Sequence, residues 1–339
     1  MEKRKIGITT TVPVEIIFAG NCIPVDLNNI FITSKNPEDF ILIAEREGFP
    51  RTTCSWIKGI YTSAIKENIK EIIAVMEGDC SNTHALSEIF QTKGIKIIPF
   101  SFPFSKDYDT LKRNLENLMN YFQVSWEEVI IEKKNIDKVR KKLFEIDELT
   151  YKDNKVNGFE NHFFLVNSSD FKGDYTKFSK EIDFFIKKAK RRKPFREKIR
   201  LGLIGVPPII TDLYFQIEKM DARVVFNEVQ RQFAMLNFND DLVEQYLTYT
   251  YPYNVFERIK DINFEIKKRK IDGIIHYVQS FCFRSIEDSI FKKNLIVPVI
   301  TIEGDRPQKL DERTKIRLES FIDMLKMRKI RNEKNYIST

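Results

Sequence analysis

The sequence predicts an α/β protein with two parallel-sheet units, and three observations support this prediction. Short apolar segments with strand character alternate with amphipathic helical segments near both ends of the chain. The stretch between them, 107–197, has helical apolar spacing almost throughout. The length of 339 residues is sufficient for two domains. Strands separated by helices form parallel sheets with right-handed crossovers, so both ends of the chain should fold in this way.

The first predicted domain is 1–106. Pro13 fits the first turn of a helix, because a missing backbone N–H costs nothing there. Gly94 ends another helix, since glycine favours the residue after a helix end. The expected strands are 6–9, 22–27, 71–77 and 95–100, and the expected helices follow Pro13 and cover 37–47, 55–68 and 82–93.

The second predicted segment, 107–197, is a helical insert and basic linker. Its three helical patterns have long charged faces, which suggests that they wrap or bridge the two α/β units. Only 162–167 has some strand character. A dense basic run closes the segment, and a solvated helix end with a linker is the favoured interpretation over a site for phosphates or an acidic partner. The run contains Lys187, Lys188, Lys190, Arg191, Arg192, Lys193, Arg196, Lys198 and Arg200.

The third predicted domain, 198–339, repeats the plan of the first. Strands are expected from 199 and at 222–228, 272–278 and 295–302, and helices at 211–220, before 272, up to about 293, and at 311–331. Each half therefore has a cysteine after an interior strand. This shared plan would place groups from both halves in a cleft between two facing units.

Composition restricts the class of protein. Apolar residues make up 42% and charged residues 31% of the chain, as in soluble globular proteins. No apolar run approaches a membrane span, and the N-terminus lacks a signal-peptide pattern, so we expect a cytoplasmic protein. The net charge of +7 comes from interspersed charges without an aromatic platform, which argues against nucleic-acid binding. No phosphate-loop or dinucleotide fingerprint occurs.

Three of the four cysteines are the most informative residues. Cys54, Cys80 and Cys282 each stand just past a short apolar run. Because parallel strands end at one edge of a sheet, residues beyond several strands can meet in one crevice. Three thiolates meeting there would hold a 4Fe-4S cluster with one iron open to another ligand. A single cysteine in such a position is more often simply buried, but three equivalent settings favour a metal site.

Two alternatives concern the remaining ligands. Cys22 begins a strand, so core packing is its expected role, with a fourth-ligand role as the alternative. Zinc is the competing metal, and His84 could complete a zinc site, but no CxxC knuckle is present. A position on a helix face is the simpler interpretation of His84.

Three carboxylates could move protons near a bound substrate. Glu15 lies in the first helix, while Glu303 and Asp305 follow the strand 295–302. Capping and surface roles are the alternatives for each of them. With His84, they form our set of candidate proton-transfer residues.

Several segments in order resemble the 2-hydroxyacyl-CoA dehydratase family, which includes 2-hydroxyglutaryl-CoA dehydratase and benzoyl-CoA reductase subunits and double-cubane cluster proteins. They are TTVPVEIIFAGNCIPVDLNN, CSWIKGIY, GDCSNT, the turn at Cys282, and VPVITIEGD with the final helix. The resemblance spans nearly the whole chain and is weakest through the helical middle. The ordered set is specific, although no single motif is.

The resemblance implies two Rossmann-like or flavodoxin-like domains facing across a cleft that holds a 4Fe-4S cluster. The family's three ligands fall on Cys54, Cys80 and Cys282. It also implies a separate ATP-hydrolysing iron-sulfur activator that injects one electron at low potential, and either a homodimer or a heterodimer with a related subunit. The implied function is low-potential reduction or dehydration of a small substrate such as an acyl-CoA thioester. A cluster carrier for electron transfer and a zinc-binding regulatory protein are the alternatives.

Overall fold

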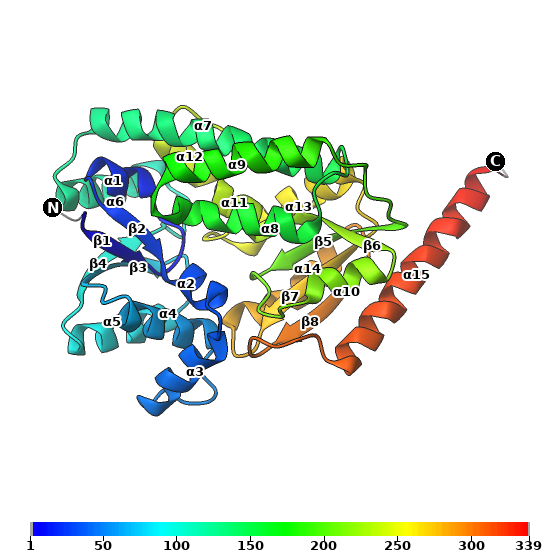
Figure 1. Ribbon diagram of the computed structural model, residues 1–339, viewed down its shortest axis with the longest axis horizontal. Coiled ribbons are helices and arrows are strands. Elements are labelled where there is room, and N and C mark those ends of the chain that lie inside the picture. The colour runs from blue at the N-terminus through cyan, green and yellow to red at the C-terminus, as the bar shows by residue number, and fades with distance from the viewer. Residues whose placement is uncertain (1–2, 338–339) are drawn as a thin grey trace. The chain divides into compact units, whose positions relative to one another are not determined.

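The protein contains two parallel four-stranded sheets, as the sequence predicts (Figure 1). The computed structural model describes residues 3–337, with the side chains described as far as residue 331. The strand orders β2-β1-β3-β4 and β6-β5-β7-β8 match position by position, which confirms the repeated plan. The first sheet contains β1 (Lys5–Ile8), β2 (Ile23–Asp26), β3 (Glu71–Glu77) and β4 (Lys96–Ser101), and the second contains β5 (Ile199–Gly205), β6 (Ala222–Asn227), β7 (Gly273–Gln279) and β8 (Val299–Gly304).

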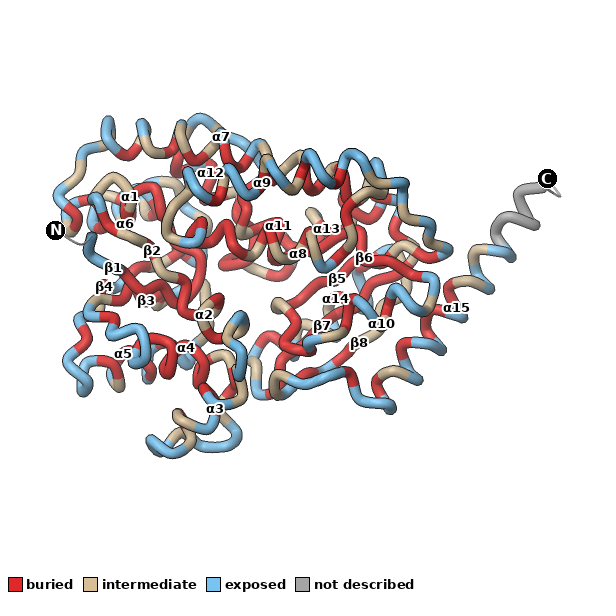
Figure 2. Tube along the Cα trace, in the orientation of Figure 1, coloured by how far each residue is buried: buried red, intermediate tan, exposed pale blue. Residues whose placement is uncertain are grey.

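The chain divides into two compact units, each built from several segments. Unit 1 comprises Met1–Phe144, Phe164–Phe185 and Arg231–Asn254, and unit 2 comprises Glu145–Phe163, Ile186–Gln230 and Val255–Thr339. In the second sheet, β6 and β7 are buried at every residue, whereas β8 is only partly buried (Figure 2). Each unit therefore has a core of its own around one sheet.

The structure divides the helical middle, predicted as the segment 107–197 that wraps or bridges the two α/β units, between the two units. Its helices are shared between the units because their apolar faces complete the two cores. In unit 1, for example, the Phe122 ring lies 3.0 Å from where a Cβ on Gly20 would stand. The helices concerned are α6 (Tyr108–Phe122), α7 (Trp126–Tyr151), α8 (Gly158–Val166) and α9 (Tyr175–Lys190).

The segment 162–167, given some strand character above, is helical, and the prediction was wrong for a local reason. Asn157 and Glu160 form a capping box before α8: Glu160 N–H donates to Asn157 Oδ1 (2.8 Å), and Asn157 N–H donates to Glu160 Oε2 (3.1 Å). Such reciprocal bonds satisfy the first amide groups of a helix. The apolar run that follows is therefore the buried part of a helix.

Unit 1 packs α4 against its sheet. Buried Ile57, Ile60, Tyr61 and Ala64 lie on this helix, and Gly59 allows the Phe31 ring to approach so closely that a Cβ would stand 2.3 Å from it. The other helices of this unit outside the middle segment are α1 (Val14–Ala19), α2 (Leu27–Thr33), α3 (Pro37–Arg46), α4 itself (Ser55–Lys66), α5 (Asn82–Thr92) and α12 (Leu242–Thr248).

Unit 2 has an apolar core between its sheet and two helices. Ile262 of α13 and Phe291 of α14 are fully buried in it together with Ile274 of β7. The helices outside the middle segment are α10 (Leu213–Lys219), α11 (Glu228–Ala234), which begins in unit 2 and ends in unit 1, α13 (Val255–Arg269), α14 (Asp288–Asn294) and α15 (Glu312–Ile337).

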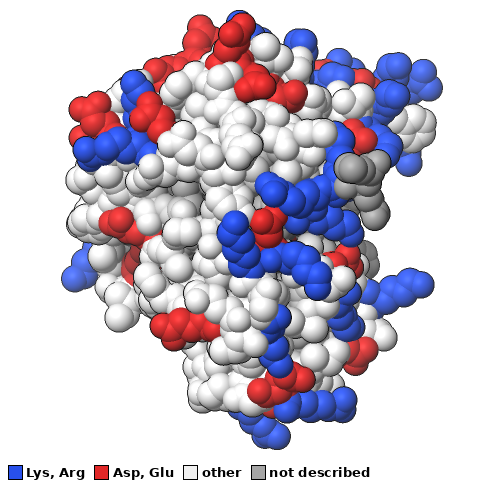
Figure 3. Space-filling model, turned by 90° about the vertical axis from the view of Figure 1, so that its left-hand side faces the viewer, with Lys and Arg blue, Asp and Glu red and all other residues white. Residues whose placement is uncertain are grey.

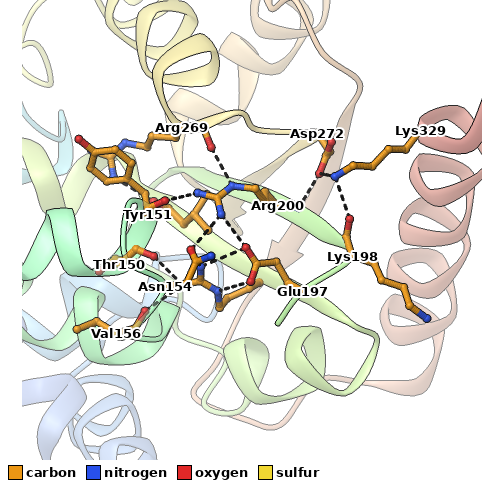
Figure 4. A network of polar contacts seen from close by, with 12 residues as sticks. Thr150, Tyr151, Asn154, Val156, Glu197, Lys198, Arg200, Arg269, Asp272 and Lys329 are labelled. Carbon is orange, nitrogen blue, oxygen red and sulfur yellow. Dashed lines mark hydrogen bonds and ion pairs between the residues drawn. The ribbon is translucent and has the colours of Figure 1, made fainter. Parts of the chain in front are cut away.

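Part of the basic run has a structural role in unit 2. Arg200 donates to Glu197 Oε1 (2.7 Å) and to Asn154 Oδ1 (3.1 Å) (Figure 4). Arg192 pairs with Glu160 (2.7 Å). The remaining basic side chains of the run are exposed. On the face drawn in Figure 3, acidic side chains stand among the basic ones, as expected for solvated surfaces.

Candidate functional site

Cys80 and Cys54 both lie at the carboxyl edge of the first sheet. Cys80 follows β3, and its carbonyl accepts a hydrogen bond from Thr83 N–H (3.0 Å) at the start of α5. Cys54 is the N-cap residue of α4, and α4 runs back to the amino end of β3. A helix that leads into a parallel strand begins at the carboxyl edge of the sheet. The two residues pack in the same apolar cluster.

The prediction that Cys54 follows a strand was wrong. The residue does not follow a strand, because α3 and a turn precede it. Lys58 fixes that turn. The residue is 1% exposed, and its ammonium group donates to Glu45 Oε1 (2.8 Å) and to the Arg51 carbonyl (3.0 Å). Cys54 therefore lies at the carboxyl edge as the N-cap of a helix that runs back to the amino end of β3, and not as a residue after a strand.

Cys282 occupies the corresponding edge in unit 2. β7 ends at Gln279, and Phe281 has a positive φ of 63° that reverses the chain. Cys282 N–H then donates to the Gln279 carbonyl (3.0 Å), and the residue caps a short 3₁₀ helix, Phe283–Glu287. Cys282 is partly buried and lines a small open pocket with a volume of about 10 Å³.

An ion-pair network forms one wall of this pocket. Arg258, 1% exposed, holds Glu228 with two hydrogen bonds, Nε to Oε1 (2.7 Å) and Nη2 to Oε2 (2.8 Å). Its third bond goes to Glu287 (2.8 Å), which also accepts from Arg284 (3.0 Å). Both guanidinium groups are therefore paired with carboxylates, and Glu228 in turn accepts from Gly205 N–H (3.1 Å).

A histidine lines another side of the pocket and is held by an aspartate outside the lining. His276 Nδ1 lies 2.8 Å from Asp288 Oδ1, which also accepts from the Thr301 hydroxyl (2.6 Å). Burial lowers the pKa of His276, although Asp288 opposes this shift. Burial disfavours ionised Asp288, but bonds from Lys292, Thr301 and His276 keep its pKa below the usual value. A neutral imidazole beside an ionised carboxylate follows at neutral pH.

Two of the candidate proton-transfer residues lie in unit 1. Glu15 is fully buried, where it pairs with Arg140 (2.6 Å) and accepts from Tyr246 (2.8 Å). Burial alone would lower the pKa of Arg140, but Glu15 raises it above its usual value. His84 is exposed, and its Nε2 lies 2.8 Å from the Met76 carbonyl near the end of β3. His84 thus lies at the carboxyl edge, whereas Glu15 belongs to an internal ion pair.

The other two lie at the edge of the second sheet. Glu303 is exposed near the end of β8 and accepts a hydrogen bond from Ser280 (2.6 Å), two residues before Cys282. The Asp305 carbonyl accepts from Gln279 (2.7 Å), and its side chain belongs to an exposed residue. Both therefore lie on the edge that carries Cys282.

Cys22 lies at the opposite edge of the first sheet. It is buried immediately before β2, and its thiol donates to the Gly20 carbonyl (3.2 Å). The four residues of β2 span about 13 Å between the two edges. A cluster held by Cys54 and Cys80 is therefore out of reach of Cys22, which supports the packing role.

The chemistry and positions of the cysteines fit an anionic cluster. All four are thiols without a disulfide, and the three predicted ligands lie at helix starts on carboxyl edges. Positive helix ends favour anionic ligands such as thiolates. Within residues 3–337, no three His, Cys, Asp or Glu side chains form a group that could hold a metal ion. Cys54 and Cys80 belong to unit 1 and Cys282 to unit 2, so their convergence stays a prediction.

A comparison with protein families identifies the relatives of this chain. The sequence model of the 2-hydroxyglutaryl-CoA dehydratase D-component matches residues 9–325. The chain belongs to this family. A search of curated proteins found no match. The match confirms the predicted resemblance, and membership supports a dehydratase-type component. In the described part of the chain, no helix is both long and apolar enough to cross a bilayer.

Sequence reasoning missed several polar residues that this family member places at the Cys282 edge. The sequence patterns single out none of four residues there: His276, Asp288, Arg258 and Glu228. A signal was available: His276 lies in an otherwise apolar strand six residues before Cys282. Their partners come from helices 12 to 30 residues away, which local patterns do not reveal.

Proposed function

We propose that this protein is the cluster-bearing component of a dehydratase-type enzyme. Cys54, Cys80 and Cys282 would hold one 4Fe-4S cluster, used for low-potential one-electron reduction or dehydration of a small substrate such as an acyl-CoA thioester. The observation that carries the proposal is the position of all three thiols at the carboxyl edges of their sheets, two of them in one apolar cluster. Family membership supports the same assignment.

The residues around the thiols would determine how the cluster is held. When bound, the cluster would supply a low-potential electron and one iron without a protein thiolate. The start of α4 offers unpaired amide groups to an anionic ligand at Cys54. The apolar neighbours Ile57, Leu86 and Trp56 exclude water from that side, which strengthens electrostatic interactions. Lys58 keeps the turn before Cys54 in position.

The site would contain three thiolates. Cys22, at the far end of β2, is unsuited to a fourth, so the proposed cluster keeps one iron available for substrate or water. This argues against a closed four-thiolate electron carrier. The proposal includes a separate ATP-hydrolysing iron-sulfur activator as electron donor, a homodimer or a heterodimer with a related subunit, and a cytoplasmic location.

Metal analysis of the full chain tests this proposal. Protein purified without oxygen and reconstituted with iron and sulfide should bind close to one 4Fe-4S cluster per chain. Changing Cys54, Cys80 or Cys282 to Ser should abolish or strongly reduce the iron, while Cys22→Ser, the matched control, should retain it. A colourless wild-type protein would contradict the proposal. Stoichiometric zinc with little iron would favour the regulatory alternative.

A further inference from the structure

The pocket beside Cys282 contains one imidazole nitrogen that none of its neighbours uses. His276 is 2% exposed, and Nδ1 is engaged by Asp288. Because an ionised carboxylate only accepts hydrogen bonds, Nδ1 must carry the proton of the neutral ring. Nε2 is then an acceptor, and no residue between 3 and 337 is within hydrogen-bond distance to donate to it. Because His276 lines the open pocket, a ligand or a water in the pocket can donate a hydrogen bond to Nε2.

Gly205 leaves this edge of the ring open toward the pocket. A Cβ on Gly205 would stand 3.0 Å from His276 Cδ2, the atom bonded to Nε2. Both residues line the pocket with Cys282 and Ser285. The absence of a side chain at Gly205 therefore creates the space next to Nε2.

The charges around this space indicate which ligand it can take. Arg258 and Arg284 face it, but both are paired with Glu287, and Arg258 is also paired with Glu228. An anion would have to displace a buried carboxylate, which costs several kcal/mol. Asp288 on the other side of the ring is paired with Lys292 and Thr301. A small neutral group with an O–H donor meets none of these penalties.

We propose that this pocket is a binding site for a single hydroxyl group or water, held by a hydrogen bond to His276 Nε2. Asp288 is the positioning residue, since it fixes both the orientation of the ring and the nitrogen that carries the proton. The catalytic meaning of the site rests on the proposed function: dehydration releases a hydroxyl oxygen as water, and this pocket would receive it close to Cys282. The binding site itself does not depend on a cluster.

Nitrogen NMR on the full chain, prepared without a cluster and labelled with ¹⁵N-histidine, tests the proposal. The chain has three histidines, so His84→Asn, His162→Asn and His276→Asn assign every signal. His276 should have a protonated Nδ1 and an unprotonated Nε2, and its ring protons should show cross-relaxation with bound water. Partly buried His162, whose Nδ1 lies 2.8 Å from Gln230, is the matched control outside this pocket. A protonated Nε2, or a His276 ring without water, would overturn the proposal.

Methanol, the smallest alcohol, tests the ligand class. It should shift the His276 Nε2 signal saturably and leave His162 unchanged, and a signal that does not respond would overturn the hydroxyl assignment. His276→Asn retains a donor for Asp288 but lacks the Nε2 acceptor, so it should fold normally and lose the methanol response. Iron analysis separates the two proposals: expected NMR results without iron would contradict only the proposed function, and iron with a protonated Nε2 would contradict only this site.

Discussion

The two sheets have the same strand order, yet their carboxyl edges are chemically different. In unit 1, Cys54 and Cys80 lie in apolar surroundings at the starts of α4 and α5. In unit 2, Cys282 lies beside paired arginines, glutamates and a His276–Asp288 pair. The same scaffold thus carries a sulfur-rich edge in one unit and an edge with acid-base groups in the other. Under the proposed function, the first unit would supply two of the three thiolates, and the second would supply one thiolate and the groups that contact the substrate's polar atoms.

The largest effect on stability should come from breaking the ion-pair network of unit 2. Arg258→Leu would leave Glu228, which is fully buried, without its partner, and such losses cost about 3–5 kcal/mol. Both tryptophans, Trp56 and Trp126, belong to unit 1. In urea unfolding, circular dichroism should therefore detect the loss. Tryptophan fluorescence should change less if the units unfold separately.

A change on the exposed side of the same helix is the control for that experiment. Lys260 also lies on α13, but its side chain is 75% exposed and pairs with Glu257. Lys260→Leu should leave the unfolding curve almost unchanged, because exposed ion pairs contribute little. Equal effects of the two substitutions would contradict the network's role.

Two glycines with nearly equal backbone angles should respond differently to alanine. Gly48 has φ +103° with nothing near a Cβ, whereas Gly205 has φ +105° and a Cβ would stand 2.0 Å from the Tyr277 carbonyl oxygen. Gly48→Ala should cost about 1–2 kcal/mol from the left-handed conformation alone. Gly205→Ala should cost clearly more and also abolish the methanol response of His276. Similar losses at both positions would show that the pocket tolerates a side chain.

The sequence was sufficient for the regular parts of this comparison. β3 was predicted at 71–77 with its observed bounds, since a continuous apolar run between turns has few alternatives. Cys80 and Cys282 were correctly expected after strands, and Cys54 reached the same edge by a different route, through α4. Local spacing could not predict where the helices of the middle segment pack. Both α7 and α9 contribute residues to unit 1 and to unit 2.

The polar side of unit 2 was less predictable for a physical reason. His276, Glu228 and Arg258 look like ordinary residues of a strand and two helices, and their significance arises only when strand ends and helices meet. The isolated polar residue in the apolar strand 272–278 was the one local sign. Residues that complete a pocket from distant elements leave no fixed spacing in the chain.

A pair of buried aspartates in unit 1 should make the stability of this unit depend on pH. Asp170 is buried close to Asp26, and burial and this neighbour together raise its pKa to about 7. The folded state therefore keeps a proton that the unfolded chain releases near its usual pKa of 3.8, so stability should fall as the pH rises from about 4 to 7. Asp26→Asn removes the neighbouring charge and should make this fall shallower. Fluorescence-detected urea midpoints at several pH values measure it, and an unchanged slope would contradict the coupling.

The most direct test of the central claim is the iron and sulfide content of the anaerobically reconstituted protein beside its Cys282→Ser variant. Our account predicts about four irons and four sulfides per wild-type chain and a large loss in the variant, since the cluster needs a thiolate from the second unit. Full iron content in Cys282→Ser, or none in the wild type, would contradict it.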